Sequence, residues 1–124
     1  MDRKYDVVAL GELLIDFTEN GLSGQGNPLL EANPGGAPCN FLCAASACGA
    51  ETALIGKVGD DAFGHMLIDT LKKYRISTKG VVMDPNVFTT LAFVTLDETG
   101  DRNFSFARKP GADMMLTTED LRYS

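Results

Sequence analysis

The chain has 124 residues, of which 44% are hydrophobic and 23% charged, a composition typical of one globular domain and not of disordered or fibrous proteins. Its three cysteines lie within one short segment, which disfavours a disulfide scaffold and suits a reducing cytoplasm. The net charge of -6 disfavours nucleic acid and anionic membrane surfaces as partners, and no apolar segment approaches the roughly 20 residues that span a bilayer. We therefore expect a cytoplasmic protein that binds neither nucleic acid nor membrane.

The first part of the chain predicts a strand, a loop and a helix. Residues Tyr5–Leu10 form a continuous apolar run, typical of a parallel strand buried on both faces. The segment 21–36 is rich in glycine, asparagine and proline and predicts a loop. A helix is then expected, with Pro38 in its first turn and a stop at Gly49.

The middle of the chain predicts a strand, a helix and a hairpin. Residues Thr52–Val58 predict a second buried strand, and acidic residues at 60–61 with basic residues at 72–75 mark the ends of an amphipathic helix. A short strand is expected at Val81–Met83, and a β-hairpin is formed by residues 89–107. Both faces of this hairpin are apolar, so the domain, a ligand or a second subunit must cover each.

Near the C-terminus, Thr117 and Asp120 predict the start of a helix that has only a few residues left before Ser124. A parallel sheet of two or three strands lacks neighbours to cover it. We therefore expect an α/β fold with a mostly parallel sheet flanked by helices, of which residues 1–124 are the incomplete N-terminal part.

The common nucleotide and metal motifs are missing. No G-x-G-x-x-G loop follows the first strand, and the residues around Gly56 do not match a P-loop. Cys39 and Cys43 are four residues apart on the predicted helix, but His65 lies on another element, so no metal site is expected. The cysteines are interpreted as small core residues and His65 as a solvated helix position.

Three features converge near the end of the first strand. Gly35 and Gly36 precede the helix, where free N–H groups can face a ligand, although such pairs also form simple tight turns. Asp16 follows the first strand, where α/β proteins place ligands, and can accept two hydrogen bonds from vicinal hydroxyls; the alternative is an exposed loop carboxylate. Asn40 offers a donor and acceptors to the same space, or acts as a local cap.

Five separated motifs carry a family resemblance. They are Gly11-Glu12-Leu13-Leu14-Ile15-Asp16-Phe17, Gly35-Gly36-Ala37-Pro38-Cys39-Asn40, Gly49, Gly56-Lys57-Val58-Gly59-Asp60-Asp61-Ala62-Phe63-Gly64 and Leu91-Ala92-Phe93-Val94-Thr95-Leu96. In this order they resemble the fructokinases of the ribokinase (PfkB) carbohydrate kinase family over essentially the whole chain. The motifs are more specific for the family than for fructose within it.

The resemblance implies a ribokinase-like fold in which the hairpin, at about residues 88–108, is a lid over a sugar pocket. The residues implied to bind the sugar are Asp16 as the hydroxyl acceptor, Gly35, Gly36 and Asn40 as pocket lining, Phe104 or Phe106 packing from the lid, and Arg108 at the rim. The alternative for either phenylalanine is lid or interface core, and for the arginine a surface salt bridge.

The resemblance also implies ATP-dependent phosphorylation of a sugar hydroxyl, D-fructose to fructose 6-phosphate, with Mg²⁺. The family's catalytic aspartate lies in a Gly-Ala-Gly-Asp segment that we expect beyond Ser124, together with the ATP site. No catalytic, metal or ATP-binding residue is therefore assigned, and the chain alone is expected to be inactive. Gly111-Ala112-Asp113 resembles that segment only superficially and is interpreted as a loop.

Two alternatives stay open. The first is another sugar kinase of the family, above all one for 2-keto-3-deoxygluconate, whose carboxylate could pair with Arg108. The second is a non-catalytic sugar-binding or dimerising module. Because family lids often pair between subunits, the resemblance implies a homodimer through the lid.

Overall fold

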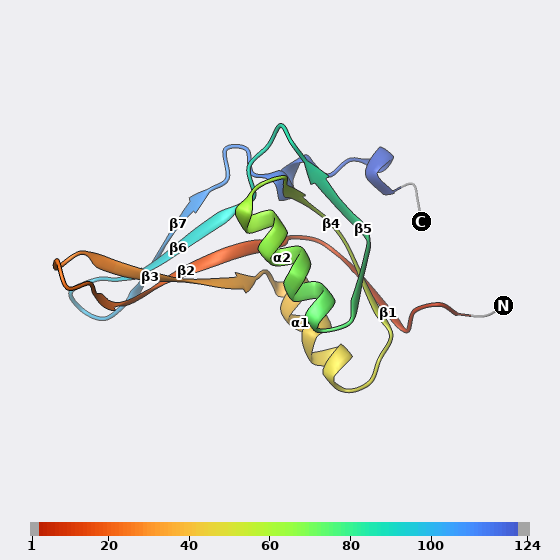
Figure 1. Ribbon diagram of the computed structural model, residues 1–124, viewed down its shortest axis with the longest axis horizontal. Coiled ribbons are helices and arrows are strands. Elements are labelled where there is room, and N and C mark those ends of the chain that lie inside the picture. The colour runs from red at the N-terminus through yellow and green to blue at the C-terminus, as the bar shows by residue number, and fades with distance from the viewer. Residues whose placement is uncertain (1–2, 122–124) are drawn as a thin grey trace.

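The computed structural model describes residues 3–121, which form two β-sheets flanked by helices (Figure 1). In chain order the elements are β1 (Val7–Leu10), β2 (Leu14–Leu22), β3 (Pro28–Gly35), α1 (Ala37–Ala47), β4 (Thr52–Gly59), α2 (Ala62–Lys73), β5 (Ile76–Asp84), β6 (Leu91–Leu96), β7 (Arg102–Ala107) and the short 3-10 helices η1 (Ala112–Met115) and η2 (Thr118–Leu121). The expected α/β class is confirmed. No helix in this part of the chain is long and apolar enough to cross a membrane.

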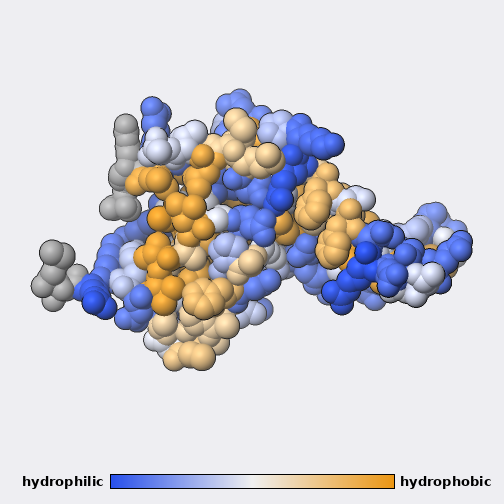
Figure 2. All heavy atoms as spheres, turned by 180° about the vertical axis from the view of Figure 1, so that it is seen from behind, coloured by the Kyte–Doolittle hydropathy of each residue, from blue (hydrophilic) through white to orange (hydrophobic). Residues whose placement is uncertain are grey.

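The first sheet is parallel, with strand order β1-β4-β5. Helix α1 packs on β1 and β4, and α2 packs on β5, so both helices lie on one face of this sheet (Figure 1). The opposite face carries a band of hydrophobic residues in the part of Figure 2 where these strands lie. Val8 and Leu10 are exposed there, so the expectation that the first strand is buried on both faces is wrong for the described residues.

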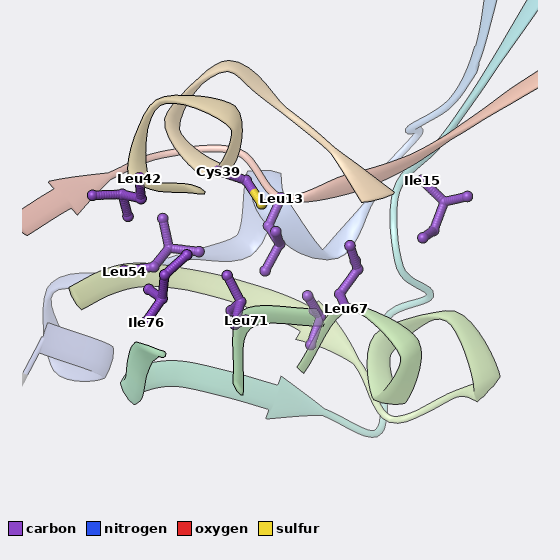
Figure 3. Close-up of a cluster of buried hydrophobic side chains, with 9 residues drawn as sticks. Leu13, Ile15, Cys39, Leu42, Leu54, Leu67, Leu71 and Ile76 are labelled. Atoms are coloured by element: carbon purple, nitrogen blue, oxygen red, sulfur yellow. The ribbon is translucent and has the colours of Figure 1, made fainter. Parts of the chain in front are cut away.

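The hydrophobic core lies between this sheet and its helices (Figure 3). Leu42 of α1 lies beside Leu54 of β4, and Leu67 and Leu71 point inward from α2; all four are fully buried. Each such side chain contributes about 1.5–3 kcal/mol through burial. The core therefore holds β4 and both helices in one rigid layer.

The helix ends follow from local chemistry. Helix α1 has Pro38 at its start, and the chain leaves it through Gly49 at a positive φ of 96°, as predicted. Asp61 caps α2 by accepting a hydrogen bond from the Gly64 N–H at 2.7 Å. The same carboxylate accepts from the Thr89 N–H at 2.8 Å, so it also ties α2 to the segment that leads into β6.

The second sheet has strand order β3-β2-β6-β7 and extends away from the helices (Figure 1). β2 pairs antiparallel with β3 and parallel with β6, while β6 and β7 form the predicted antiparallel hairpin. One face of this sheet packs toward α2 through Phe17, whose ring stacks on Phe93 and meets Phe63 edge-on. The hairpin is thus half of a larger sheet.

The loop predicted over residues 21–36 is largely wrong, because most of that segment lies in β2 and β3. The true turn is short and is closed by hydrogen bonds between Ser23 and Asn27. Prolines fit in β3 because it is an edge strand, where a missing N–H need not interrupt a ladder. Pro28 also begins that strand.

Two smaller expectations also change, and the cap expected near the C-terminus is confirmed. The strand predicted at Val81–Met83 is only part of the longer β5, since its pairing with β4 extends to both sides. The segment Gly111-Ala112-Asp113, interpreted as a loop, is largely helical, because Ala112 and Asp113 form the start of η1. At the C-terminus the Thr117 N–H donates to Asp120 at 2.8 Å, as the cap pattern predicts, while residues 122–124 lie outside the described residues.

Candidate functional site

The register of the second sheet gathers the predicted residues on one face. Asp16 of β2 is paired with Ala92 of β6, and Ala92 is paired with Phe106 of β7. Paired residues of neighbouring strands project from the same side of a sheet, so Asp16, Phe104 and Phe106 share a face. That face is opposite to the one on which Phe17 and Phe93 pack.

Asp16 lies within β2 and is partly buried, so the alternative of an exposed loop carboxylate is wrong. Gly35 lies directly against it, because a Cβ at that position would overlap the Asp16 Oδ2 atom. Burial raises the pKa of the Asp16 carboxyl, and the neighbouring charge of Glu12 raises it further. The site therefore holds a carboxylate whose charge is only partly solvated and which is ready to accept hydrogen bonds.

The start of α1 forms a second wall. Gly36 adopts a φ of 103°, and a Cβ there would lie 2.6 Å from the Glu12 carbonyl oxygen, so only glycine fits. No side chain caps this helix start. Its first N–H groups therefore remain available to a ligand, and the side chain of Asn40 lies one turn further along.

Arg108, directly after β7, is held by two carboxylates. Its Nη2 atom donates to Glu12 Oε2 at 2.9 Å and to Asp113 Oδ2 at 2.8 Å. Its guanidinium also lies over the Phe106 ring, 5.1 Å from the ring centre. Burial acts to lower the pKa of Arg108, but the hydrogen bond to Glu12 and the charge of Asp113 outweigh it and the pKa is raised.

Two aromatic rings form the outer wall. Phe104 and Phe106 stand in parallel on β7 with ring centres 6.4 Å apart, and both are at least half exposed. An exposed pair of rings beside polar groups is a platform on which the apolar face of a small ligand can pack.

These walls enclose an open cavity of about 280 Å³, near the lower end for small-ligand pockets. Its lining includes six of the seven predicted residues, namely Asp16, Gly36, Asn40, Phe104, Phe106 and Arg108. Gly35, the seventh, lies behind the Asp16 carboxylate. A groove continues from Asp16 and Phe104 along the sheet toward Leu96.

Sequence reasoning missed the residues that hold Arg108. Glu12 stands in the first motif, four residues before Asp16, and Asp113 stands in the segment interpreted as a loop. The Asp113 side chain is only 4% exposed, and the Thr90 hydroxyl donates to it. The contact between Asp113 and Thr90 was not visible in the sequence, because the two residues lie 23 positions apart along the chain.

Chemically, the cavity offers carboxylate acceptors, amide and guanidinium donors and an aromatic platform, which together suit a small polyhydroxylated molecule. Within residues 3–121 no cluster of three or more histidine, cysteine, aspartate or glutamate side chains could hold a metal ion. His65 is exposed and bonds Asp60, as expected. Cys39 is a buried core residue, but Cys48 is exposed, so the core interpretation is wrong for it.

Comparison with known proteins gives a consistent result. The family model described as pfkB family carbohydrate kinase matches residues 4–122. Fructokinase-2 from Oryza sativa subsp. japonica is 48% identical over 117 residues, which are 93% of this chain and 35% of that protein. Probable fructokinase-5 from Arabidopsis thaliana is 48% identical over 118 residues, 93% of this chain and 36% of that protein.

Solved structures agree with the sequence comparisons. A fructokinase from Xylella fastidiosa superposes with a TM-score of 0.87 at 36% identity, over 92% of this chain and 35% of that one. The same enzyme with bound ATP superposes with a TM-score of 0.85 at 34% identity, over 92% of this chain and 36% of that one. The chain spans about 35% of the length of these relatives.

Proposed function

The chain belongs to the pfkB family of carbohydrate kinases, and we propose that it forms the sugar-binding side of an ATP-dependent kinase that converts D-fructose to fructose 6-phosphate. The observation that carries the proposal is the cavity, which brings Asp16, Asn40 and the two lid phenylalanines together from three separate elements. The names of the relatives supply the substrate, since those compared above are fructokinases.

In this proposal each side chain has a role in binding. Asp16 accepts hydrogen bonds from two neighbouring sugar hydroxyls, and Asn40 and the free N–H groups of α1 donate to sugar oxygens. Phe104 or Phe106 packs on the apolar face of the sugar. The hairpin β6–β7 acts as a lid that excludes water from the sugar, which orients it for phosphoryl transfer.

ATP and Mg²⁺ do not fit the described residues. These residues contain no glycine-rich phosphate loop between a strand and a helix, and no carboxylate cluster that could hold a metal. We propose that the catalytic base and the groups that bind ATP come from the part of the family's length that this chain does not span. The chain alone is accordingly expected to bind sugar without turning it over.

A second copy of the protein would cover the end of the lid, where the groove that begins at Asp16 and Phe104 reaches Leu96. Leu96 is 60% exposed and continues the apolar surface of Phe104 and Phe106. We propose a homodimer in which this surface pairs between subunits.

The dimer is tested at Leu96. Leu91 and Phe93 are not suitable test positions, because they pack against the core and against Phe17. Leu96→Lys is expected to convert dimers to monomers in sedimentation equilibrium, and unchanged dimers would contradict the pairing.

The sugar-binding role is tested by titrating the purified chain with D-fructose in a calorimeter. Asp16→Asn is expected to weaken binding, while Asp69→Asn, an exposed aspartate on α2, serves as the matched control. Saturable binding that Asp16→Asn leaves unchanged would contradict the role of Asp16.

The kinase role needs the remaining family length. We would join residues 1–124 to the C-terminal part of the rice fructokinase-2 and measure fructose-dependent formation of ADP. Activity that disappears with Asp16→Asn supports the proposal. A folded chimera that binds ATP but does not phosphorylate fructose favours the non-catalytic module.

We also propose that the enzyme is cytoplasmic, because its cysteine usage suits a reducing compartment.

A further inference from the structure

Arg108 is the only cation among the described residues that line the cavity. A free guanidinium at the rim of a sugar pocket would attract a carboxylate, because the two groups form parallel charge-assisted hydrogen bonds. An arginine in this place therefore raises the question of whether the pocket prefers a sugar acid to a neutral sugar.

The geometry around Arg108 answers that question. Nη2 has two hydrogens, and both are taken, one by Glu12 and one by Asp113, while the two hydrogens of Nη1 have no acceptor among the described residues, so only the balance of charge can answer the question. Two carboxylates thus face one guanidinium, so the group carries no surplus positive charge toward the cavity. Its Nε atom is buried and meets no acceptor among the described residues, which leaves it out of reach of a substrate in the cavity.

The partner carboxylates are themselves held in place. Asp113 is almost fully buried and accepts a hydrogen bond from the Thr90 hydroxyl at the start of β6. Gly111 permits this contact, since a Cβ at that position would overlap the Thr90 hydroxyl oxygen. The backbone of Glu12 is fixed as well, because its carbonyl oxygen lies against Gly36, and its carboxylate is held by the bond from Arg108. The arginine is therefore clamped between the loop after β1 and the segment after β7.

The remaining charges of the cavity also disfavour an anion. Glu12 and Asp16 both line it, and their mutual repulsion contributes to the raised pKa of Asp16. The start of α1 adds about half a positive charge, which is less than either carboxylate carries. A substrate carboxylate would thus meet two like charges and a neutralised arginine.

We propose that Glu12 and Asp113 are specificity-determining residues, which clamp Arg108 so that the pocket accepts neutral sugars and rejects sugar acids. This inference rests on the proposed sugar-binding function and deepens it. The carboxylates that repel a sugar acid contribute to this choice between ligands as much as the attractive contacts to the neutral sugar do. Glu12 is the residue to change, since its side chain is 41% exposed and glutamine keeps its size.

The test compares two ligands, D-fructose and 2-keto-3-deoxygluconate, by calorimetric titration of the purified chain. The unaltered chain is expected to bind fructose at least about tenfold more tightly than the sugar acid. Glu12→Gln is expected to strengthen binding of the acid by about tenfold, because it removes one negative charge beside Arg108 and leaves the guanidinium with a surplus positive charge. Glu98→Gln, on an exposed hairpin turn, is the charge-matched control and should change neither affinity.

A double variant assigns the effect to Arg108. In Glu12→Gln/Arg108→Met the gain in acid binding should disappear, whereas a general effect of the lost charge would persist. The ratio of the two affinities is the readout, since partial unfolding would lower both together. Circular dichroism of each variant confirms that it is folded.

The outcomes separate this inference from the proposed function. Binding of fructose with equally tight binding of the acid by the unaltered chain would overturn the specificity role alone. A Glu12→Gln variant that leaves the ratio unchanged would overturn it as well. If neither ligand binds to the folded chain, the proposed function and the inference both fall.

Discussion

The two sheets of this protein are built for different tasks. In the parallel sheet, β4 is buried along nearly its whole length and the large core leucines lie between it and the helices (Figure 3). In the second sheet, every residue of β7 is exposed, and the pocket face carries polar and aromatic side chains besides aliphatic ones. The first region therefore supplies stability, and the second supplies a surface that can bind.

The boundary between the regions is held by a few specific contacts. Phe17 joins the second sheet to α2, and Asp61 joins α2 to the start of β6. Because these contacts involve residues near the base of the sheet, its outer part depends little on the core. Binding residues can then vary in charge and exposure at little cost to folding.

The largest expected effect is loss of stability in the core. Leu67→Ala should lower the free energy of unfolding by about 2–5 kcal/mol, because Leu67 is fully buried and its removal leaves a cavity. Leu96→Ala, at the end of β6, should change it by less than about 0.5 kcal/mol. Urea unfolding followed by circular dichroism measures both. Equal losses would erase the distinction between the two regions.

A buried ion cluster in the stable region provides the next effect. Lys57 of β4 donates to Asp120 at 2.8 Å and to the Met115 carbonyl at 3.0 Å, and it lies 3.6 Å from Asp84. Lys57→Met should lower the free energy of unfolding by about 2–3 kcal/mol, since it leaves two partly buried carboxylates without their cation. Lys79→Met, an exposed lysine on β5, is the control and should have little effect.

The ion cluster around Lys57 should also make the free energy of unfolding depend on pH. The hydrogen bond from Lys57 is the main cause of the lowered pKa of Asp120. A lowered carboxyl pKa in the folded state means that the stabilisation is present above the ordinary value of 3.8 and is lost as the pH falls through the lowered value. Below pH 4 the unaltered chain should therefore lose stability faster than Lys57→Met, as seen in urea unfolding across pH.

In the binding region the expected effect is on affinity rather than on stability. Asp16→Asn should weaken fructose binding by about 1.5–3 kcal/mol, the value of one charge-assisted hydrogen bond. It should leave the free energy of unfolding unchanged or slightly higher at neutral pH, because burial disfavours the charged form of Asp16. A variant that loses both binding and stability would place Asp16 in the structural framework instead.

The smallest effect is a pH shift of sugar binding. Since the pKa of Asp16 is raised, fructose affinity should fall on acidification at a pH above 3.8, where an ordinary aspartate is still ionised. Glu12→Gln removes one cause of the raised pKa and should move this midpoint to lower pH. Titration with fructose between pH 4 and 7 tests both, and a midpoint unaffected by Glu12→Gln would contradict the electrostatic coupling.

Local patterns in the sequence indicated most elements of the stable region, although they gave only part of β5 and the wrong burial for β1. The apolar run Thr52–Val58 became β4, and the acidic cap at Asp61 and the stop at Gly49 mark the observed helix ends. Such signals work because burial on a central strand and capping of a helix depend on residues close in the chain. Strands β2 and β3 both escaped prediction. The prolines and exposed leucines of the edge strand β3 carry no burial pattern, and pairing with β2 alone makes it a strand.

The binding site divides in the same way. The sequence by itself indicated Asp16, the glycine pair and Asn40, because the order of strand, glycines and helix places them near one sheet edge. Only the tertiary structure decided the state of Arg108, which bonds a glutamate 96 residues away. A salt bridge forms where folding brings opposite charges within about 3–4 Å, and no local pattern encodes that distance. The register of β2, β6 and β7 set the distance between Arg108 and Glu12. The same register therefore set the charge that the cavity presents to a ligand.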